Sequence, residues 1–525
     1  MAVLGSLLKR GIGLTGTVIR QRRVNGYKSQ RKAFIKLLNK ARYTAFGEAY
    51  HFEEIMSSAL FRKDKQFYDL YRQYVPIHDY NKMYSEWWHR TKDGEKNVTW
   101  PGRVKFFALS SGTSEAASKY IPVTKDMVKA MQRTSIRQII ALSEFKNLSD
   151  ELFEKGYLML GGSTDLKFSG RYFEGDLSGI NASQIPFWFE RFYKPGKEIA
   201  RIRDWELKLE EITKQAKDWD IGYVVGVPAW IQLLLERIIK HYNLKNIHEI
   251  WPNLEVFGWG GVSFEPYRGG FEKLLGRPIT YIETYLASEG FLAYQARPEA
   301  KGMQLALNQG IFFEFIPFND ENFNGDGEVR PEAQTLMIDD VEEGVEYALL
   351  ISTCSGTWRY LIGDTVRFTD KRRGEITITG RTKHYLSLCG EHLSVENMNR
   401  AIELATAELG ISIPEYTVAG VPEGALFAHH WYVGTDDAVD ADVLRRLIDE
   451  KLKELNDDYA VERRHALRDV KLTVLPVQAF YDWMAAKGKM GGQHKFPRVL
   501  RKMMIQNWLD FLHSASYEVE AVASK

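Results

Sequence analysis

The pattern of apolar and polar positions divides the chain into stretches of different character. Residues 28–75 place apolar side chains such as Phe34 and Leu37 at helical spacing, and Pro76 ends this pattern in an extended segment. From residue 104 a buried apolar run enters a loop of small residues, and Thr124 is suited to cap the helix that follows. These positions predict an N-terminal helical region that leads into a strand, a loop and a helix.

Strand-like apolar runs then recur, with helical segments between several of them, at residues 157–162, 221–228, 254–261, 278–285 and 311–318. This alternation predicts an α/β architecture with a mainly parallel sheet. Residues 345–380 differ, because short alternating strands surround a charged turn at Asp370–Gly374, which predicts an antiparallel hairpin or small barrel. After Gly380 the pattern returns to helix and strand in a compact α+β unit.

We therefore expect two domains. Residues 1–380 would form a large N-terminal domain of mixed and parallel sheets with helices and a small barrel-like part. Residues 381–525 would form a smaller, mobile α+β domain that acts as a lid. A chain of 525 residues is also too long for one hydrophobic core.

Composition and charge exclude several classes of protein. The net charge of +1 indicates no global field for binding nucleic acid. The two cysteines, Cys354 and Cys389, argue against a disulfide scaffold or a zinc site and favour a reducing cytoplasm. No apolar run is long enough to span a bilayer. Every charged residue before Glu48 is basic, which suits either a weak contact with an anionic membrane surface or, as the favoured interpretation, an amphipathic helix packed on the protein.

A turn rich in hydroxyl groups follows the apolar run at residue 104 and precedes a lysine. Its residues are Ser110, Ser111, Gly112, Thr113 and Ser114, with Lys119 after them. Such a turn can offer backbone and side-chain donors to phosphate oxygens, and the lysine adds a positive charge. It is not a Walker A loop, and taken alone a plain turn is the more common structure.

Other segments suit the remaining parts of a nucleotide site. Tyr285 ends a strand and can stack on a planar base, and Glu289 four residues later can bind Mg²⁺. Asp364 follows a glycine turn and suits a ribose diol, although an Asp turn that opens a hairpin explains it equally. The Gly380–Lys383 segment suits a hinge, and the glycine-rich loop at 487–498 suits an active-site flap or an exposed loop.

The order of these segments resembles the adenylate-forming superfamily of acyl-CoA synthetases, luciferases and amino-acid-activating domains. Within it the chain most closely resembles the acyl acid amido synthetases of the Gretchen Hagen family. SSGTS followed by Lys119 resembles the first motif of that family, and TYLASEG at 284–290 resembles the second in the form expected of bacterial members. TWRYLIGD at 357–364 resembles the third motif, and GGQHKFPR at 491–498 resembles the late Gln-x-Lys-x-Pro-Arg stretch of the family.

This resemblance implies an enzyme that uses ATP and Mg²⁺ to adenylate a carboxylic acid and then transfers the acyl group to an amine, with an amino acid as the expected acceptor. It assigns catalysis to Lys495 and Glu289, makes Glu289 the Mg²⁺ ligand, and leaves Lys489 as an alternative to Lys495. The cofactor-binding residues that it implies are Ser110, Ser111, Gly112, Thr113, Ser114, Lys119, Tyr285, Ser288, Asp364 and Arg381.

Two departures from the family pattern bear on this expectation. Glu115, Ala116 and Ala117 stand where the family usually has glycines, and a carboxylate near polyphosphate is repulsive. Lys383 occupies the aspartate position of the superfamily hinge, which weakens the alternative of an acyl-CoA ligase. A third alternative is a protein that binds nucleotide or acyl acid without turnover. For the acid itself, an apolar pocket or plain core is expected at Phe187, Trp188, Tyr223 and Trp230.

Overall fold

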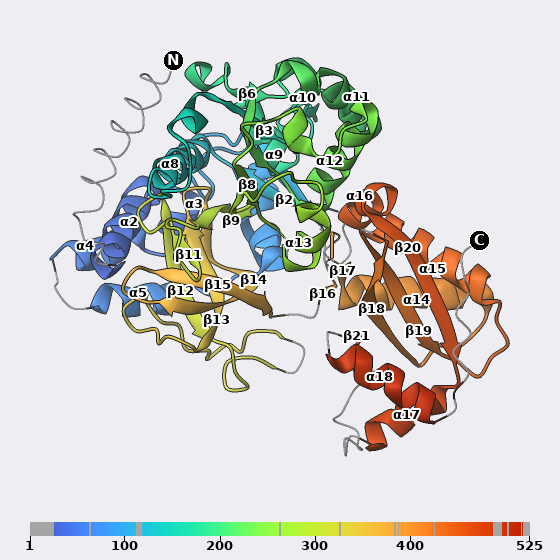
Figure 1. The fold of residues 1–525 in the computed structure, drawn as a ribbon. Coiled ribbons are helices and arrows are strands. Elements are labelled where there is room, and N and C mark those ends of the chain that lie inside the picture. The colour runs from blue at the N-terminus through green and yellow to red at the C-terminus, as the bar shows by residue number, and fades with distance from the viewer. Residues whose placement is uncertain are drawn as a thin grey trace.

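The computed structural model describes residues 26–61, 65–111, 118–261, 264–324, 327–382, 385–386, 388–389, 391, 393–424, 426–486, 496–500, 503–515 and 517. Helices and strands alternate along most of the chain, so the expected α/β class is confirmed. Figure 1 shows a larger part, coloured blue to yellow-orange, beside a smaller part coloured orange to red. The domain boundary at residues 380/381 stays a prediction.

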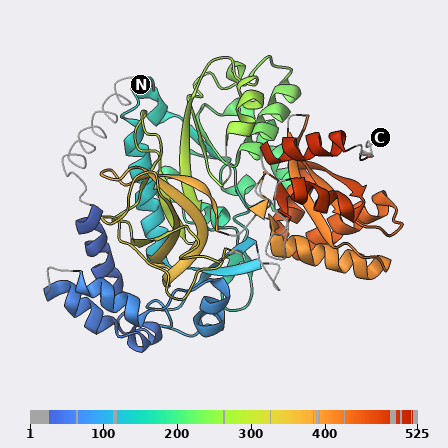
Figure 2. The same cartoon turned by 90° about the horizontal axis from the view of Figure 1, so that it is seen from below.

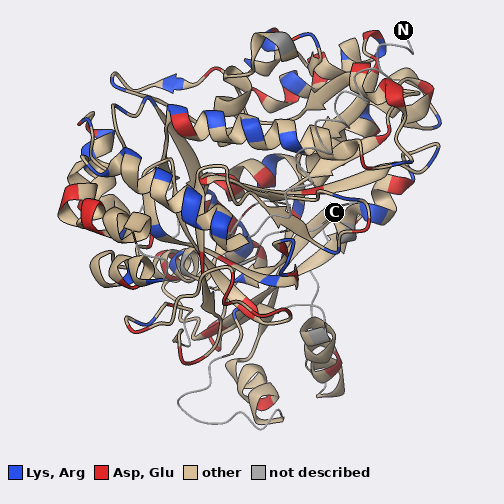
Figure 3. Ribbon diagram, turned by 90° about the vertical axis from the view of Figure 1, so that its left-hand side faces the viewer, with Lys and Arg blue, Asp and Glu red and all other residues tan. Residues whose placement is uncertain are grey.

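The N-terminal region is helical, as its apolar spacing predicts. Its helices are α2 (Gly26–Ala41), α3 (Ala45–Ala49), α4 (Phe52–Phe61), α5 (Gln66–Tyr74), α6 (Tyr80–Met83) and α7 (His89–Lys92), with the π-helical turn η1 (Tyr84–Trp88) before α7. In α2 the apolar side chains are buried and the lysines Lys28, Lys32 and Lys36 are exposed. Figure 3 views the left-hand side of Figure 1 and shows Lys and Arg repeated along helices on this surface. The packed amphipathic helix is therefore confirmed for residues 26–41, whereas the basic residues 9–23 lie outside the described residues.

One sheet of eleven strands forms the centre of the larger part, in the order β12-β13-β14-β15-β11-β10-β9-β8-β7-β3-β6. Its parallel half contains β3 (Gly156–Met159), β6 (Tyr193–Lys194), β7 (Ile221–Val225), β8 (Val256–Trp259) and β9 (Thr280–Ala287). Its antiparallel half adds β10 (Gly290–Tyr294), β11 (Met303–Leu305), β12 (Ile311–Pro317), β13 (Glu346–Thr353), β14 (Thr357–Asp370) and β15 (Glu375–Arg381).

The expectation of a mainly parallel sheet is thus correct for one half only. The strands after β9 are joined largely by short connections, and such connections favour antiparallel neighbours. The strands expected at residues 345–380 are β13, β14 and β15, and the charged turn at Asp370–Gly374 joins the last two.

A second sheet has four strands in the order β2-β1-β5-β4, and its strand β1 contacts α9. Its strands are β1 (Phe106–Ser111), β2 (Ser118–Val123), β4 (Lys167–Phe168) and β5 (Phe173–Gly175). The helices of the larger part are α8 (Lys125–Leu142), α9 (Leu177–Ser183), α10 (Lys197–Ala200), α11 (Trp205–Gln215), α12 (Pro228–Tyr242) and α13 (Glu265–Glu272). Short 3₁₀ turns are η2 (Asp150–Glu154), η3 (Phe187–Phe189), η4 (Ala216–Asp218) and η5 (Ile247–Glu249). Thr124 caps α8 as expected, because its side chain accepts a hydrogen bond of 3.1 Å from the amide of Met127.

The smaller part is an α+β unit. Its strands are β16 (Tyr385–Leu386), β17 (Leu393–Ser394), β18 (Glu415–Glu423), β19 (Leu426–Gly434), β20 (Leu467–Leu475) and β21 (Val499–Leu500). Its helices are α14 (Val395–Leu409), α15 (Ala441–Leu455), α16 (Asp457–His465), α17 (Val477–Ala486) and α18 (Met503–Ser514). The last four strands form one sheet in the order β20-β19-β18-β21.

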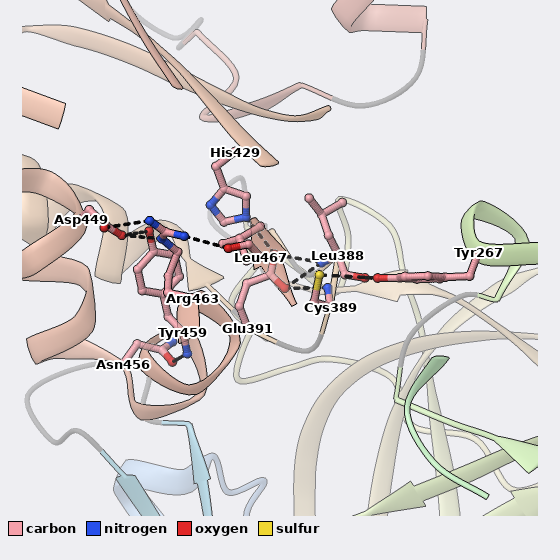
Figure 4. Close-up of polar contacts among 10 residues, drawn as sticks. All are labelled: Tyr267, Leu388, Cys389, Glu391, His429, Asp449, Asn456, Tyr459, Arg463 and Leu467. Carbon is pink, nitrogen blue, oxygen red and sulfur yellow. Dashed lines mark hydrogen bonds and ion pairs between the residues drawn. The ribbon is translucent and has the colours of Figure 1, made fainter. Parts of the chain in front are cut away.

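A packed interface joins the two parts. Figure 2 shows the smaller part against the green region that holds α11 to α13. One continuous apolar cluster includes side chains from both, such as Leu234 and Tyr267 from the larger part and Tyr459 from the smaller. In Figure 4 the Tyr267 hydroxyl donates a hydrogen bond of 2.5 Å to the carbonyl of Leu388, and the buried Glu391 accepts from the amides of Leu388 and Cys389. Among the described residues, no helix is both long and apolar enough to cross a membrane.

Candidate active site

Glu289 lies in the tight turn between two antiparallel strands. Ala287 at the end of β9 pairs with Gly290 at the start of β10, so Ser288 and Glu289 form the connection. Glu289 is only 8% exposed. Burial raises the pKa of Glu289, and the positive charge of Lys119 opposes this shift in part.

Asp364 lies on β14 beside this turn and is held by two partners. The Tyr285 hydroxyl donates to one of its carboxylate oxygens. The Arg381 Nε atom lies 2.9 Å from the other, because Arg381 stands directly opposite Asp364 on β15. Gly363 takes a φ of 90°, a left-handed conformation that suits glycine, and so turns the strand just before Asp364.

The structure therefore brings together residues that are far apart in the sequence. Lys119, Asp364 and Arg381 are all close enough to act electrostatically on Glu289. Burial and the charge of Asp364 also raise the pKa of Tyr285, whose ring is only 5% exposed. This cluster of two buried carboxylates and two partly exposed cations is the candidate nucleotide site.

The expected strand–loop–helix unit around the phosphate turn is wrong. Ser110 pairs with Lys119 in an antiparallel hairpin, so a second strand, β2, follows the turn before α8 begins. Helix α8 therefore begins at Lys125, after β2, and not directly after the turn. Lys119 Nζ lies 5.5 Å from the centre of the Tyr80 ring. Gly112, Thr113 and Ser114 lie outside the described residues, as do Glu115, Ala116 and Ala117.

The other expected cations lie outside the described residues. Lys383 of the expected hinge lies outside the described residues, and so do Lys487, Lys489 and Lys495 of the glycine-rich loop. Arg381, which belongs to the expected hinge segment and was also expected to bind the cofactor, is a partner of Asp364.

An apolar cavity of about 200 Å³ lies beneath α8. Its lining includes Met131, Ser135, Ile139, Leu142, Tyr157, Met159, Tyr223, Thr284, Leu286 and Phe291. Met131 and Phe291 also line a small hollow that contains Glu289, so the cavity and the charged cluster are neighbours. Thr284 and Leu286 face the cavity while Tyr285 between them reaches Asp364, as the alternation of side chains along a strand requires.

Of the aromatic residues expected around an acid pocket, Tyr223 does line the cavity. Phe187 is 87% exposed, and the side chain of Trp188 lies outside the described part of the structure. Trp230 donates a hydrogen bond of 3.1 Å to Glu462 in α16, so it belongs to the interface between the two parts. The contribution of α8 to this cavity was not predicted from the sequence, although Met131, Ser135 and Leu142 are spaced along one helical face.

Among the described residues no group of three or more His, Cys, Asp or Glu side chains is placed to hold a metal ion. Glu289 nevertheless fits Mg²⁺, because Mg²⁺ prefers oxygen ligands and commonly binds through one or two carboxylates together with substrate phosphates.

Models of three protein domains match the chain in succession. They are the GH3 family N-terminal domain at residues 18–193, the GH3 family central domain at 304–381 and the GH3 family C-terminal domain at 396–503. The chain belongs to the GH3 family. The resemblance to the Gretchen Hagen family in the sequence is thereby confirmed.

Curated GH3 relatives match about half of the chain. Indole-3-acetic acid-amido synthetase GH3.4 of Arabidopsis thaliana is 27% identical over 297 residues, which cover 50% of this chain and 47% of the relative. Jasmonoyl–L-amino acid synthetase JAR4 of Nicotiana attenuata is 27% identical over 382 residues, which cover 60% of this chain and 64% of the relative. The chain thus spans about half the length of the first curated relatives that it matches.

Solved structures share the fold over nearly the whole chain. The GH3.15 acyl acid amido synthetase has a TM-score of 0.57 at 15% identity and covers 97% of this chain and 96% of its own. A 2-hydroxyisobutyryl-CoA ligase has the same TM-score at 13% identity, and the match covers 93% of this chain and 92% of the ligase. Both likenesses show the two-part α/β fold of this GH3 chain.

Proposed function

We propose that this GH3 chain is an ATP-dependent, AMP-forming ligase that joins a carboxylic acid to an amine, with an amino acid as the acceptor. The observation that carries the proposal is the cluster of the buried carboxylates Glu289 and Asp364 with the cations Arg381 and Lys119, beside an apolar cavity. The printed names of the curated relatives, which describe acid–amido synthetases, support the same reaction.

The proposed reaction has two steps. A carboxylate oxygen of the acid attacks the α-phosphorus of ATP, the bond to pyrophosphate breaks, and an acyl-adenylate forms. The nitrogen of the amine then attacks the activated carbonyl, AMP leaves with the electrons of the C–O bond, and the amine loses a proton. Neither step needs a strong base to activate the acid, so the protein contributes mainly positioning and charge stabilisation.

Each described residue has a defined part in this proposal. Asp364 would accept hydrogen bonds from the ribose hydroxyls, and Tyr285 would border the adenine while it orients Asp364. Glu289 would bind the Mg²⁺ that accompanies ATP, and that ion would neutralise phosphate charge. Lys119 would add positive charge near the phosphates. Lys495, or Lys489 in its place, stays the expected cation at the reacting carboxylate.

The cavity beneath α8 is the proposed site for the body of the acid. Its volume of about 200 Å³ and its mostly apolar lining favour an aryl, indolic or short aliphatic group rather than a charged one. A cytoplasmic location stays the expectation from the cysteine content.

Acid-dependent exchange of labelled pyrophosphate into ATP tests the first step, over a panel of aryl, indolic and fatty acids. Glu289→Ala should reduce this exchange by at least a hundredfold, whereas the exposed Glu299→Ala should leave it within twofold of the wild type. Normal exchange in Glu289→Ala would remove that residue from the mechanism. A wild type without exchange for any acid would favour a binding protein instead.

A second candidate function is an acyl-CoA ligase, because a CoA ligase shares the fold at the same TM-score as the GH3.15 synthetase. Product analysis with a mixture of amino acids and CoA separates the two enzymes. We expect an amide as the product. A thioester without any amide would refute the amide reaction.

A further inference from the structure

The helix α2 presents a row of basic side chains on one side of the larger part. Every charged residue of α2 is basic, and Lys28, Lys32, Lys36 and Lys40 follow one another at four-residue spacing. All four are exposed. Residues at this spacing lie along one face of a helix, and the apolar face of α2 is buried against the protein. The packing that buries one face of α2 therefore leaves the basic row in solvent.

Helix α8 repeats this arrangement beside α2. Its exposed residues Lys125, Lys129 and Arg133 have the same four-residue spacing, and Asp126 is the only acidic residue of the helix. The Lys40 Nζ atom lies 3.6 Å from the Asp126 carboxylate, so the end of α2 and the start of α8 are neighbours. Figure 3 shows this side of the molecule, with Lys and Arg repeated along its helices. The two rows together form one surface, the basic face, which consists of Lys28, Lys32, Lys36, Lys40, Lys125, Lys129 and Arg133.

The protein neutralises little of the charge on the basic face. No acidic side chain in the described part of the chain forms an ion pair with Lys32, Lys36 or Lys129. The whole chain has a net charge of only +1, so the protein outside α2 and α8 is net acidic. The positive field is therefore confined to one side of the molecule, where it can attract a polyanionic surface.

Exposed apolar side chains border the basic face. Phe61 at the end of α4 is 86% exposed, and its neighbour Leu60 is 52% exposed. The guanidinium of Arg31 in α2 donates a hydrogen bond to the carbonyl just before Leu60, so this end of α4 lies beside the basic row. On α8, Ile136 is 38% exposed and stands two helical turns after Lys129, which places it on the same side of the helix. Basic residues combined with exposed apolar residues are typical of helices that bind a lipid surface.

We propose that the basic face docks the protein on the surface of an anionic lipid bilayer. Each Lys or Arg close to such a surface strengthens binding about fivefold, because the headgroups carry negative charge. Leu60 and Phe61 would enter the interfacial layer, where apolar side chains leave water. A nucleic acid duplex would match the charge but offers little apolar surface to these two side chains, so a lipid surface is favoured. The proposal does not depend on the ligase reaction.

Cosedimentation of the full chain with lipid vesicles tests the contribution of charge. Vesicles of phosphatidylcholine with about one-third phosphatidylserine should bind the protein at low salt, and vesicles of phosphatidylcholine alone should bind it at least tenfold more weakly. The triple variant Lys32→Gln/Lys36→Gln/Lys129→Gln should bind the anionic vesicles about a hundredfold more weakly than the wild type, because it removes three charges of the basic face.

A matched triple variant controls for the change in total charge. Lys217→Gln/Lys245→Gln/Lys273→Gln removes three exposed lysines that lie beside α11, α12 and α13, away from α2 and α8 (Figure 1). It should bind the anionic vesicles within twofold of the wild type. Urea unfolding of both triple variants should match the wild type, since the substituted side chains are exposed.

A single substitution tests the apolar contribution. Phe61→Ser should weaken binding to the anionic vesicles about tenfold, because a Phe side chain gains about that factor when it leaves water. Phe168→Ser in β4 is the control, since Phe168 is also exposed but belongs to the second sheet. It should leave binding within twofold of the wild type.

Three results would overturn the proposal. They are equal binding by the wild type and the variant of Lys32, Lys36 and Lys129, equal losses in the two triple variants, and equal binding of the wild type to neutral and anionic vesicles. Binding to transfer RNA that requires these three lysines, without binding to anionic vesicles, would assign the basic face to a nucleic acid and would also refute the lipid surface.

Discussion

Acid should destabilise this protein through His78, which lies in the extended segment beside the site. Its ring is fully buried, and burial lowers the pKa of His78 to about 4, with a smaller contribution from the charge of Lys82. The Glu86 carboxylate at 3.8 Å from Nε2 would favour the charged form, but burial outweighs it. His78 is therefore neutral in the folded protein at neutral pH.

The sign and size of the effect follow from proton linkage. An unfolded histidine takes up a proton near pH 6.5, whereas folded His78 does so only near its lowered pKa of about 4. The stability that neutral His78 provides is fully present above pH 6.5 and is lost as the pH falls from there towards 4. The expected loss is about 2 kcal/mol at pH 5 and about 3 kcal/mol at pH 4.

His78→Asn isolates this contribution. The Asn amide can still donate to the Trp358 carbonyl, which the His78 ring contacts in the wild type, but Asn has no group that titrates. Urea unfolding, followed by tryptophan fluorescence at pH 7.5 and pH 5, measures the free energy of unfolding of each protein. Other groups titrate alike in both proteins, so the wild type should lose about 2 kcal/mol more than the variant between these pH values. Equal losses in the two proteins would refute the reasoning.

Other substitutions test the cavity, the interface and the core. Ser135→Phe should fill the cavity beneath α8 and raise the KM for the acid about tenfold in pyrophosphate exchange, with the KM for ATP unchanged. An equal rise in both KM values would argue against the cavity as the acid site. Trp230→Phe removes the hydrogen bond to the buried Glu462, so amide hydrogen exchange in α16 should become about tenfold faster. Unchanged exchange in α16 would mean that this contact does not stabilise the helix. Gln30→Ala leaves the Leu307 and Ile311 carbonyls and the Phe313 amide without their buried partner. It should lower the free energy of unfolding, measured by urea titration, by about 3 kcal/mol. A loss below about 1 kcal/mol would contradict this expectation.

The sequence alone determined the local features of this protein. Helical spacing predicted α2 to α5, and Thr124 predicted the start of α8, because such signals depend on neighbours within one or two turns. The motif around Glu289 and the motif that ends at Asp364 also predicted the family that the domain models then identified.

Only the tertiary structure decided which of these residues meet. Tyr285 and Asp364 are hydrogen-bonded although they stand 79 positions apart, and Arg381 of the expected hinge segment pairs with Asp364. The second strand of the phosphate hairpin and the place of Trp230 in the interface were likewise decided by partners distant in sequence. The physical reason is that strand pairing and burial depend on the whole packed arrangement, whereas helix periodicity and capping depend on residues close together in the sequence.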